Sequence, residues 1–182
     1  MPITAKTYQI IALEDPEGRW ELHHGALREK PSMSYDHNYS MTQLGSQLIL
    51  QLDPVEYQVR MNTGRVSRID ETYYIPDVSV IPVGLTKRFR GRYDLLEIYS
   101  DPLPFVAEIW FPSTGAYDVD QKLPEYQRRG DWEIWRLHPY ERTLTAYRHG
   151  ADGSYSHEVV RGGLITLVAL PRVTIDLDAL FS

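Results

Sequence analysis

The chain contains no cysteine among its 182 residues. This absence excludes disulfides, thiolate metal sites and a cysteine nucleophile, and it fits a reducing compartment. No apolar run reaches the roughly 18 residues that a membrane span requires, and the first residues show no basic stretch followed by an apolar one. We therefore expect a soluble, cytoplasmic protein with no membrane association.

Positive charge is also scarce. The sequence has 19 Lys and Arg against 25 Asp and Glu, a net charge of −6. Because a protein that coats nucleic acid by charge alone carries the opposite sign, any nucleic-acid contact must be local. The one basic cluster lies in a stretch expected to be a loop and consists of Lys87, Arg88, Arg90 and Arg92. It is a weak candidate for nucleic-acid contact, and a solvated loop or a subunit contact explains it as well.

Several familiar catalytic motifs are missing. The sequence has no glycine-rich phosphate loop, no GxSxG and no HExxH. His23 and His24 are adjacent, and neighbouring residues of a strand point to opposite faces, so these two cannot easily share one metal ion. The sequence therefore gives no support for zinc chemistry centred on histidine.

The length and composition of the chain predict one domain over residues 1–182, because 42 % of the residues are hydrophobic and 182 residues suit a single core. The expected helices cover 7–13, 34–52 and a segment that ends at Gly130, with a short one near 181. The expected strands cover 19–22, 26–29, 56–61, 65–69, 74–81, 104–111, 133–137, 143–148, 155–160 and 164–167, with one more after 173. The three from 56 to 81 suggest a curved antiparallel meander. This order predicts an α/β (α+β) fold with a mixed central β-sheet flanked by helices.

Two carboxylates stand out because they fall in apolar strands. Glu108 lies inside the nearly continuous apolar run 104–111, which is typical of a strand buried on both faces. Asp77 follows Pro76 within the Val- and Ile-rich run 74–81. A buried charge is costly unless it is paired or binds a metal. Both carboxylates are therefore candidate functional residues.

A lysine follows on the next helix. Lys122 lies near the start of the segment that ends at Gly130, and Pro124 predicts that this helix begins close to Asp120 or is kinked there. Two carboxylates can hold a hard cation such as Mg²⁺, with water and substrate phosphate as the other ligands. The ion activates water and offsets charge on the phosphate, and a nearby lysine adds positive charge. This is phosphodiester hydrolysis in outline.

Each of these residues also has an ordinary structural explanation. Asp77 could be a turn residue at a strand end, Glu108 the partner of a buried arginine, and Lys122 a solvated lysine at a helix start. His37, in the first turn of the long helix, could equally cap or pack there.

The arrangement resembles a known family. Pro76-Asp77 followed by Glu108-Ile109-Trp110 resembles the PD-(D/E)XK nuclease superfamily. A narrower pattern, over nearly the whole chain, is similar to its Uma-type putative restriction endonuclease family. That pattern comprises Trp20-Glu21-Leu22, Gly25, His37, Pro76-Asp77-Val78, Glu108, Pro112-Ser113-Thr114, Asp118, Lys122, Tyr126, Gly130, Glu133 and Trp135.

The resemblance implies a restriction-endonuclease-like fold and a site. Asp77 and Glu108 would ligate Mg²⁺ or Mn²⁺. Lys122 would stand in for the lysine that the superfamily places two residues after the glutamate, where this chain has Trp110. By strand parity the indole of Trp110 would lie beside the site, and Lys122 would reach across that space. Glu21 would be a further catalytic acid, and His37 a weaker candidate.

The implied activity is hydrolysis of DNA phosphodiester bonds by metal-activated water. DNA would be the substrate, and a homodimer or higher homo-oligomer would match the two-fold symmetry of a duplex. Two alternatives stay open. One is a catalytically silent nuclease-fold module that binds a partner or forms an oligomeric scaffold, and the other is a metal-dependent hydrolase of smaller phosphoesters.

Overall fold

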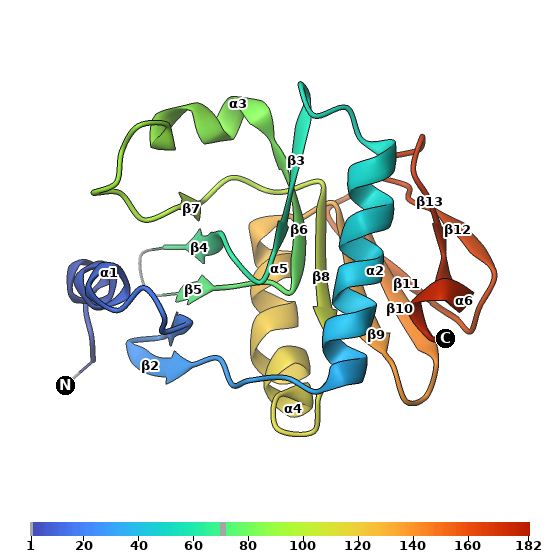
Figure 1. The fold of residues 1–182 in the computed structure, drawn as a ribbon, viewed down its shortest axis with the longest axis horizontal. Helices are drawn as coiled ribbons and strands as arrows, with labels where there is room; N and C mark the ends of the chain where they lie inside the picture. Colours follow the sequence, from blue (N-terminus) through green and yellow to red (C-terminus); the bar gives the residue numbers. More distant parts are fainter. Residues whose placement is uncertain (1, 70–71) are drawn as a thin grey trace.

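The computed structural model describes residues 2–69 and 72–182 and shows a mixed α+β architecture (Figure 1). The strands are β1 (Trp20–His23), β2 (Ala26–Glu29), β3 (Tyr57–Met61), β4 (Arg65–Arg68), β5 (Thr72–Tyr74), β6 (Val78–Pro82), β7 (Ile98–Tyr99), β8 (Phe105–Ile109), β9 (Glu133–His138), β10 (Thr143–His149), β11 (Tyr155–Val160), β12 (Leu164–Thr166) and β13 (Thr174–Asp176). The helical segments are α1 (Ala5–Glu14), α2 (Tyr35–Gln51), α3 (Val83–Thr86), the 3₁₀ turn η1 (Lys87–Phe89), α4 (Gly115–Tyr117), the π-helical turn η2 (Asp118–Lys122), α5 (Leu123–Arg129) and α6 (Leu177–Leu180).

Three sheets form from the described strands. The largest has the order β11-β10-β9-β8-β6-β3, the second the order β2-β1-β5-β4-β7, and the smallest pairs β12 with β13. Within the described residues, every helix is too short or too polar to cross a membrane.

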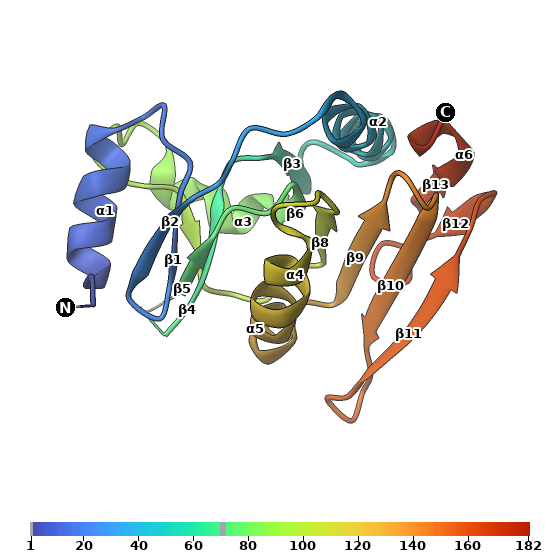
Figure 2. The same ribbon diagram turned by 90° about the horizontal axis from the view of Figure 1, so that it is seen from below.

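Strand β8 is the centre of the largest sheet. It pairs antiparallel with β6 and parallel with β9, and all five of its residues are buried, as its apolar sequence predicts. Figures 1 and 2 show α2 on one face of this sheet and α4 with α5 on the other. Because side chains alternate along a strand, Phe105 and Ala107 face α2, whereas Val106 and Glu108 face α5. The carboxylate of Glu108 is therefore enclosed between the sheet and a helix.

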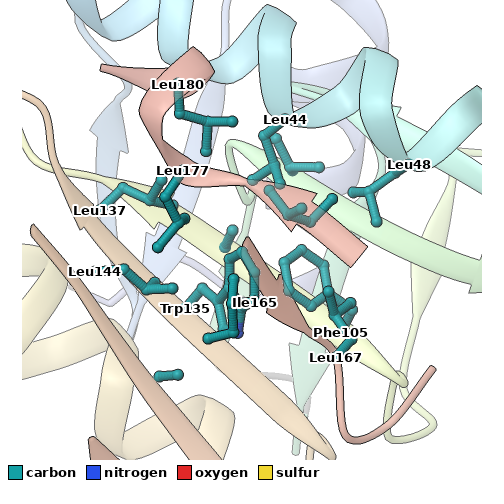
Figure 3. Close-up of a cluster of buried hydrophobic side chains, with 14 of the residues drawn as sticks. Leu44, Leu48, Phe105, Trp135, Leu137, Leu144, Ile165, Leu167, Leu177 and Leu180 are labelled. Carbon is teal, nitrogen blue, oxygen red and sulfur yellow. The ribbon is translucent and has the colours of Figure 1, made fainter. Parts of the chain in front are cut away.

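The main hydrophobic core fills the α2 face of this sheet (Figure 3). Leu44 and Leu48 of α2 belong to the same buried cluster as Phe105 and Trp135, and the last residues of the chain close it through Leu180. This packing keeps β8 and β9 in register, and that register places the side chains on the opposite face.

Truncation of this core is expected to be costly. Leu44→Ala should lower the free energy of unfolding by about 2–5 kcal/mol, because it removes buried methyl groups and leaves a cavity. Urea denaturation measures the loss. Leu50→Ala on the same helix is the control, because Leu50 is 84 % exposed and its truncation should change the free energy by less than about 0.5 kcal/mol. Equal effects of the two substitutions would contradict this description of the core.

The prediction of a single strand over 74–81 is wrong, and so is the meander. Strand β5 ends at Tyr74 and pairs with β1 and β4, whereas β6 begins at Val78 and pairs with β3 and β8. Pro76 lies between them and has no N–H to donate, so a continuous ladder cannot pass through it. The chain changes sheets here, and Asp77 lies at the point of change.

The helical segment that carries Lys122 begins at Gly115 and continues through α4, η2 and α5, so the predicted start close to Asp120 is wrong, and the irregularity expected there is a π-helical turn. Proline inside an α-helix removes a hydrogen bond and clashes with the preceding turn. Pro124 is the second residue of α5, just after the π-helical turn ends at Lys122, and a proline is tolerated in this first turn. The helix ends at Gly130, whose φ of +77° is left-handed, as the sequence predicts.

Candidate active site

The ammonium of Lys122 joins three carboxylates. Its Nζ lies 2.8 Å from Glu21 Oε1, 3.2 Å from Glu108 Oε1 and 3.6 Å from Asp118 Oδ1. These residues come from β1, β8 and η2, and Lys122 itself is only 1 % exposed. The predicted residues Glu21, Glu108 and Lys122 therefore converge on one buried point.

Local structure explains this convergence. The Glu21 carboxylate also accepts a hydrogen bond of 2.8 Å from the backbone N–H of Ile75, which ties β1 to the segment between the two main sheets. The π-helical turn brings Lys122 and Asp118 to the same side. The ring of Trp110 stacks on the ring of His138, with 4.2 Å between the ring centroids, and does not separate Lys122 from Glu108. Lys122 therefore reaches Glu108 past the indole.

Asp77 forms a second group beside the first. Its Oδ1 accepts from Lys30 Nζ at 2.7 Å, and its Oδ2 accepts from His37 Nε2 at 3.1 Å and from the backbone N–H of Ile109 at 2.7 Å. Burial alone would raise the pKa of Asp77, but Lys30 and His37 outweigh it and hold that pKa well below its usual range. Asp77 is therefore an ionised carboxylate fixed in one orientation.

Glu108 behaves in the opposite way. Burial raises the pKa of Glu108 to about 8, because the loss of hydration outweighs the attraction of Lys122 and Lys30. Tyr126 donates a hydrogen bond to Oε1, while Oε2 is buried and receives no hydrogen bond from any described residue. Buried polar atoms normally have partners, so an unpaired carboxylate oxygen indicates a position for a ligand.

Lys122 stays charged in this setting. Burial disfavours its ammonium, but Glu108, Glu21 and Asp118 together outweigh burial and raise the pKa of Lys122 well above its usual value. The site thus holds one permanent positive charge among several carboxylates.

Two cavities meet at Glu108 and Asp118, which line both. The smaller, of about 10 Å³, is close to the space of one water molecule and is also lined by Glu21, Asp77 and Lys122. The larger, of about 200 Å³, is also lined by Trp110, Gly115, Arg136, Leu137, His138, Glu141, Thr143 and Thr145. The larger cavity gives a ligand access to Glu108.

The donor chemistry fits a hard cation. Mg²⁺ takes oxygen ligands and is often held by one or two carboxylates. The unpaired Oε2 of Glu108 offers such a ligand, and Asp77 supplies the second carboxylate. In the arrangement shown, lysines neutralise both groups, and no three His, Asp or Glu side chains of the described residues are placed to hold an ion together. A cation shared by Asp77 and Glu108 would therefore have to displace Lys30 and Lys122 from these carboxylates.

The basic cluster lies elsewhere. The stretch expected to be a loop begins with α3 and η1, and Figure 1 shows it far from α4. Arg88 donates to the backbone carbonyl of Ile98, and Arg92 pairs with Asp94 at 2.7 Å. Neither these two arginines nor Lys87 and Arg90 line the two cavities. Their contact with nucleic acid stays a prediction, separate from the site.

Of the residues predicted from the sequence, Asp77, Glu108, Lys122 and Glu21 line one small cavity, and His37 contacts Asp77. Their roles stay predictions. Sequence reasoning missed Lys30, which pairs with Asp77 although the two are 47 residues apart. Lys30 precedes a proline at the end of a hairpin, where a lysine is normally exposed, so no local pattern marks it as buried.

Comparisons with known proteins identify the family and the fold. The model of the Uma2 family, described as "Putative restriction endonuclease", matches residues 5–178. Among solved structures, the chain is similar to a putative nuclease belonging to DUF820 from Anabaena variabilis, with a TM-score of 0.79 and 20 % sequence identity. That similarity covers 99 % of this chain and 98 % of the other, and it confirms the predicted fold class. No match was found among curated proteins.

Proposed function

Because the chain belongs to the Uma2 family of putative restriction endonucleases, we propose that it is an endonuclease that hydrolyses DNA phosphodiester bonds with Mg²⁺ or Mn²⁺. One observation carries the proposal. Asp77, Glu108 and Lys122 come from different elements and meet, buried, beside one cavity. Pairs of acidic residues with a lysine suit phosphoryl chemistry, in which a cation and an ammonium offset charge on the phosphate.

Each residue has a definite task. Asp77 and Glu108 would hold the cation, which supplies positive charge against the phosphate and makes water more acidic. Lys30 and His37 keep the Asp77 carboxylate ionised and oriented. The Lys122 ammonium adds positive charge where negative charge develops on the phosphate.

Tyr126 and Glu21 support these groups. The Tyr126 hydroxyl binds Oε1 of Glu108 and so leaves Oε2 as the oxygen without an internal partner. Glu21 holds the Lys122 ammonium close to Glu108, with Nζ 2.8 Å from its carboxylate. Glu21 therefore positions the lysine in this proposal.

Cleavage of plasmid and short duplex DNA tests the function. With Mg²⁺ or Mn²⁺ present, Glu108→Gln should reduce the cleavage rate by about 10²–10³-fold, a loss typical of removing one preorganised charged group. The glutamine side chain keeps the size of glutamate and can still accept from Tyr126, so the loss reports on charge. Glu56→Gln is the control, because Glu56 is exposed at the other end of α2. Equal cleavage by wild type and Glu108→Gln would reject the proposed role.

A silent binding module is the second candidate. The observation that favours it is the pairing of Asp77 with Lys30 and of Glu108 with Lys122, which could serve structure alone. Calorimetric titration with Mg²⁺ or Mn²⁺ discriminates between the two. Binding that disappears in Glu108→Gln favours the nuclease, and an absence of binding in the wild type favours the silent module.

We also propose that the protein acts as a homodimer, because two-fold symmetric proteins match two-fold symmetric duplex sites. Light scattering after size exclusion should give twice the chain mass of 21.1 kDa. A mass equal to one chain at the concentrations used for cleavage would reject the dimer.

A further inference from the structure

Arg136 is the neighbour of Glu108 across the sheet. Strands β8 and β9 run parallel, and their register pairs Glu108 with Arg136. Paired residues of adjacent strands point to the same face and lie about 4.8 Å apart. Both side chains line the cavity of about 200 Å³, and Arg136 is half-buried there.

The guanidinium of Arg136 has no internal counterion. Three other arginines that are partly or fully buried pair with a carboxylate: Arg60 lies 2.7 Å from Glu97, Arg129 lies 3.0 Å from Asp131, and Arg148 lies 2.6 Å from Glu158. Arg19, Arg28 and Arg65 instead donate to an uncharged oxygen. Among the described residues, nothing makes a hydrogen bond or an ion pair with the Arg136 side chain. None of its nitrogens is among the fully buried polar atoms without a partner in the described residues, so its N–H groups stay open to a ligand that enters the cavity.

The cavity favours a phosphate at this position. A guanidinium offers a planar fork of N–H donors that matches phosphate oxygens. The residues of β10 that pair with Arg136 and His138 are Thr145 and Thr143, and both threonines line the same cavity. Glu108, Asp118 and Glu141 also line this cavity and repel an anion, and Arg136 is the one Lys or Arg among its lining residues, so the attraction for a phosphate has to come from Arg136.

We propose that this cavity binds a backbone phosphate of the nucleic acid next to the one cleaved at Glu108, and that Arg136 holds it. The inference rests on the proposed nuclease function and adds a specific subsite to it. It also places the nucleic acid across the face formed by β9 and β10, beside α4. Arg136 is a substrate-positioning residue in this arrangement.

DNA binding measured without metal tests the subsite. In EDTA, the fluorescence anisotropy of a short labelled duplex should show about tenfold weaker binding for Arg136→Gln than for the wild type. The dependence of log affinity on log salt should become shallower by about 0.9, the value for one phosphate contact. Arg136→Lys keeps the charge without the fork, so its affinity should lie between the two.

The matched control is Arg172→Gln. Arg172 is exposed and lines a cavity at the opposite end of α2, so its loss should change the affinity less than about twofold.

Because Arg136 has no internal partner, Arg136→Gln should unfold at the same temperature as the wild type. If Arg136→Gln did not fold, Arg136→Lys would provide the test of the subsite. Lysine keeps the charge, so an affinity equal to that of the wild type would reject the fork contact.

Two results would overturn the inference: wild-type affinity in Arg136→Gln, or an equal loss in Arg172→Gln. Failure of the nuclease function looks different. In that case the wild type would not cleave DNA with Mg²⁺ or Mn²⁺, yet its affinity in EDTA would still depend on Arg136.

Discussion

Asp77→Asn is expected to abolish DNA cleavage and to lower the free energy of unfolding by about 3–5 kcal/mol. Asp77 is 1 % exposed, and its carboxylate binds Lys30, His37 and the backbone of Ile109. Asparagine has the same shape but no charge, so the Lys30 ammonium would remain buried without a counterion. Urea denaturation measures the stability, and the plasmid assay measures the cleavage.

A double substitution separates the two roles of Asp77. Adding Lys30→Met to Asp77→Asn removes the unpaired ammonium and should recover most of the lost stability, because a buried ion pair can often be replaced by apolar or neutral groups. Cleavage should stay absent, since the carboxylate is still missing. Recovered cleavage in the double variant would show that Asp77 acts only through structure.

The matched control for Asp77 is Asp94→Asn. Asp94 also pairs with a cation, Arg92, at 2.7 Å, but both side chains are about half exposed. An exposed pair contributes about 0–1 kcal/mol, so this variant should be nearly as stable as the wild type. If Asp77→Asn were no less stable than Asp94→Asn, the buried network would not have the importance assigned to it.

Lys122→Met is expected to lose about 10²–10³-fold in cleavage and, at the same time, to respond more strongly to divalent cations. The Lys122 ammonium lies among Glu21, Glu108 and Asp118. Without it, these carboxylates repel one another, and a divalent cation relieves that repulsion. The variant should therefore be less stable than the wild type in EDTA and should recover stability as Mg²⁺ or Mn²⁺ is added.

Thermal unfolding at increasing cation concentration measures this response, because a ligand that binds the folded state raises the midpoint further as its concentration exceeds its Kd. Lys6→Met on α1 is the control, since Lys6 is exposed and should leave the cation response unchanged. A Lys122→Met variant that responds to cations no more than the wild type would show that the ammonium does not occupy the cation position. Unchanged cleavage would remove Lys122 from the proposed mechanism.

The sequence predicts the central strand and its carboxylate for a clear reason. A nearly continuous apolar run such as 104–111 is favourable only when buried on both faces, so a glutamate within it is conspicuous. The same argument marks Asp77. The residue pattern also marks Lys122, the resemblance adds Glu21, and the structure brings all four residues to one small cavity. The burial of Asp77 and Glu108 could be predicted because it depends on local patterns, and the roles of all four residues stay predictions.

Other features depend on pairing between distant segments. Nothing local shows that the chain changes sheets at Pro76, because proline tolerates both a strand edge and a link between strands. Lys30 looks like an exposed hairpin lysine until the fold places it 2.7 Å from Asp77.

Glu108 shows most clearly what the sequence determines and what only the tertiary structure determines. Its position in an apolar run determined, from the sequence alone, that a buried carboxylate needs a partner or a ligand. Only the tertiary structure decided that Lys122 and Tyr126 bind one of its oxygens, and that the register of β9 sets Arg136 beside it. The physical reason is that the environment of a buried charge is set by which strands and helices pair, and those contacts join residues far apart in the chain.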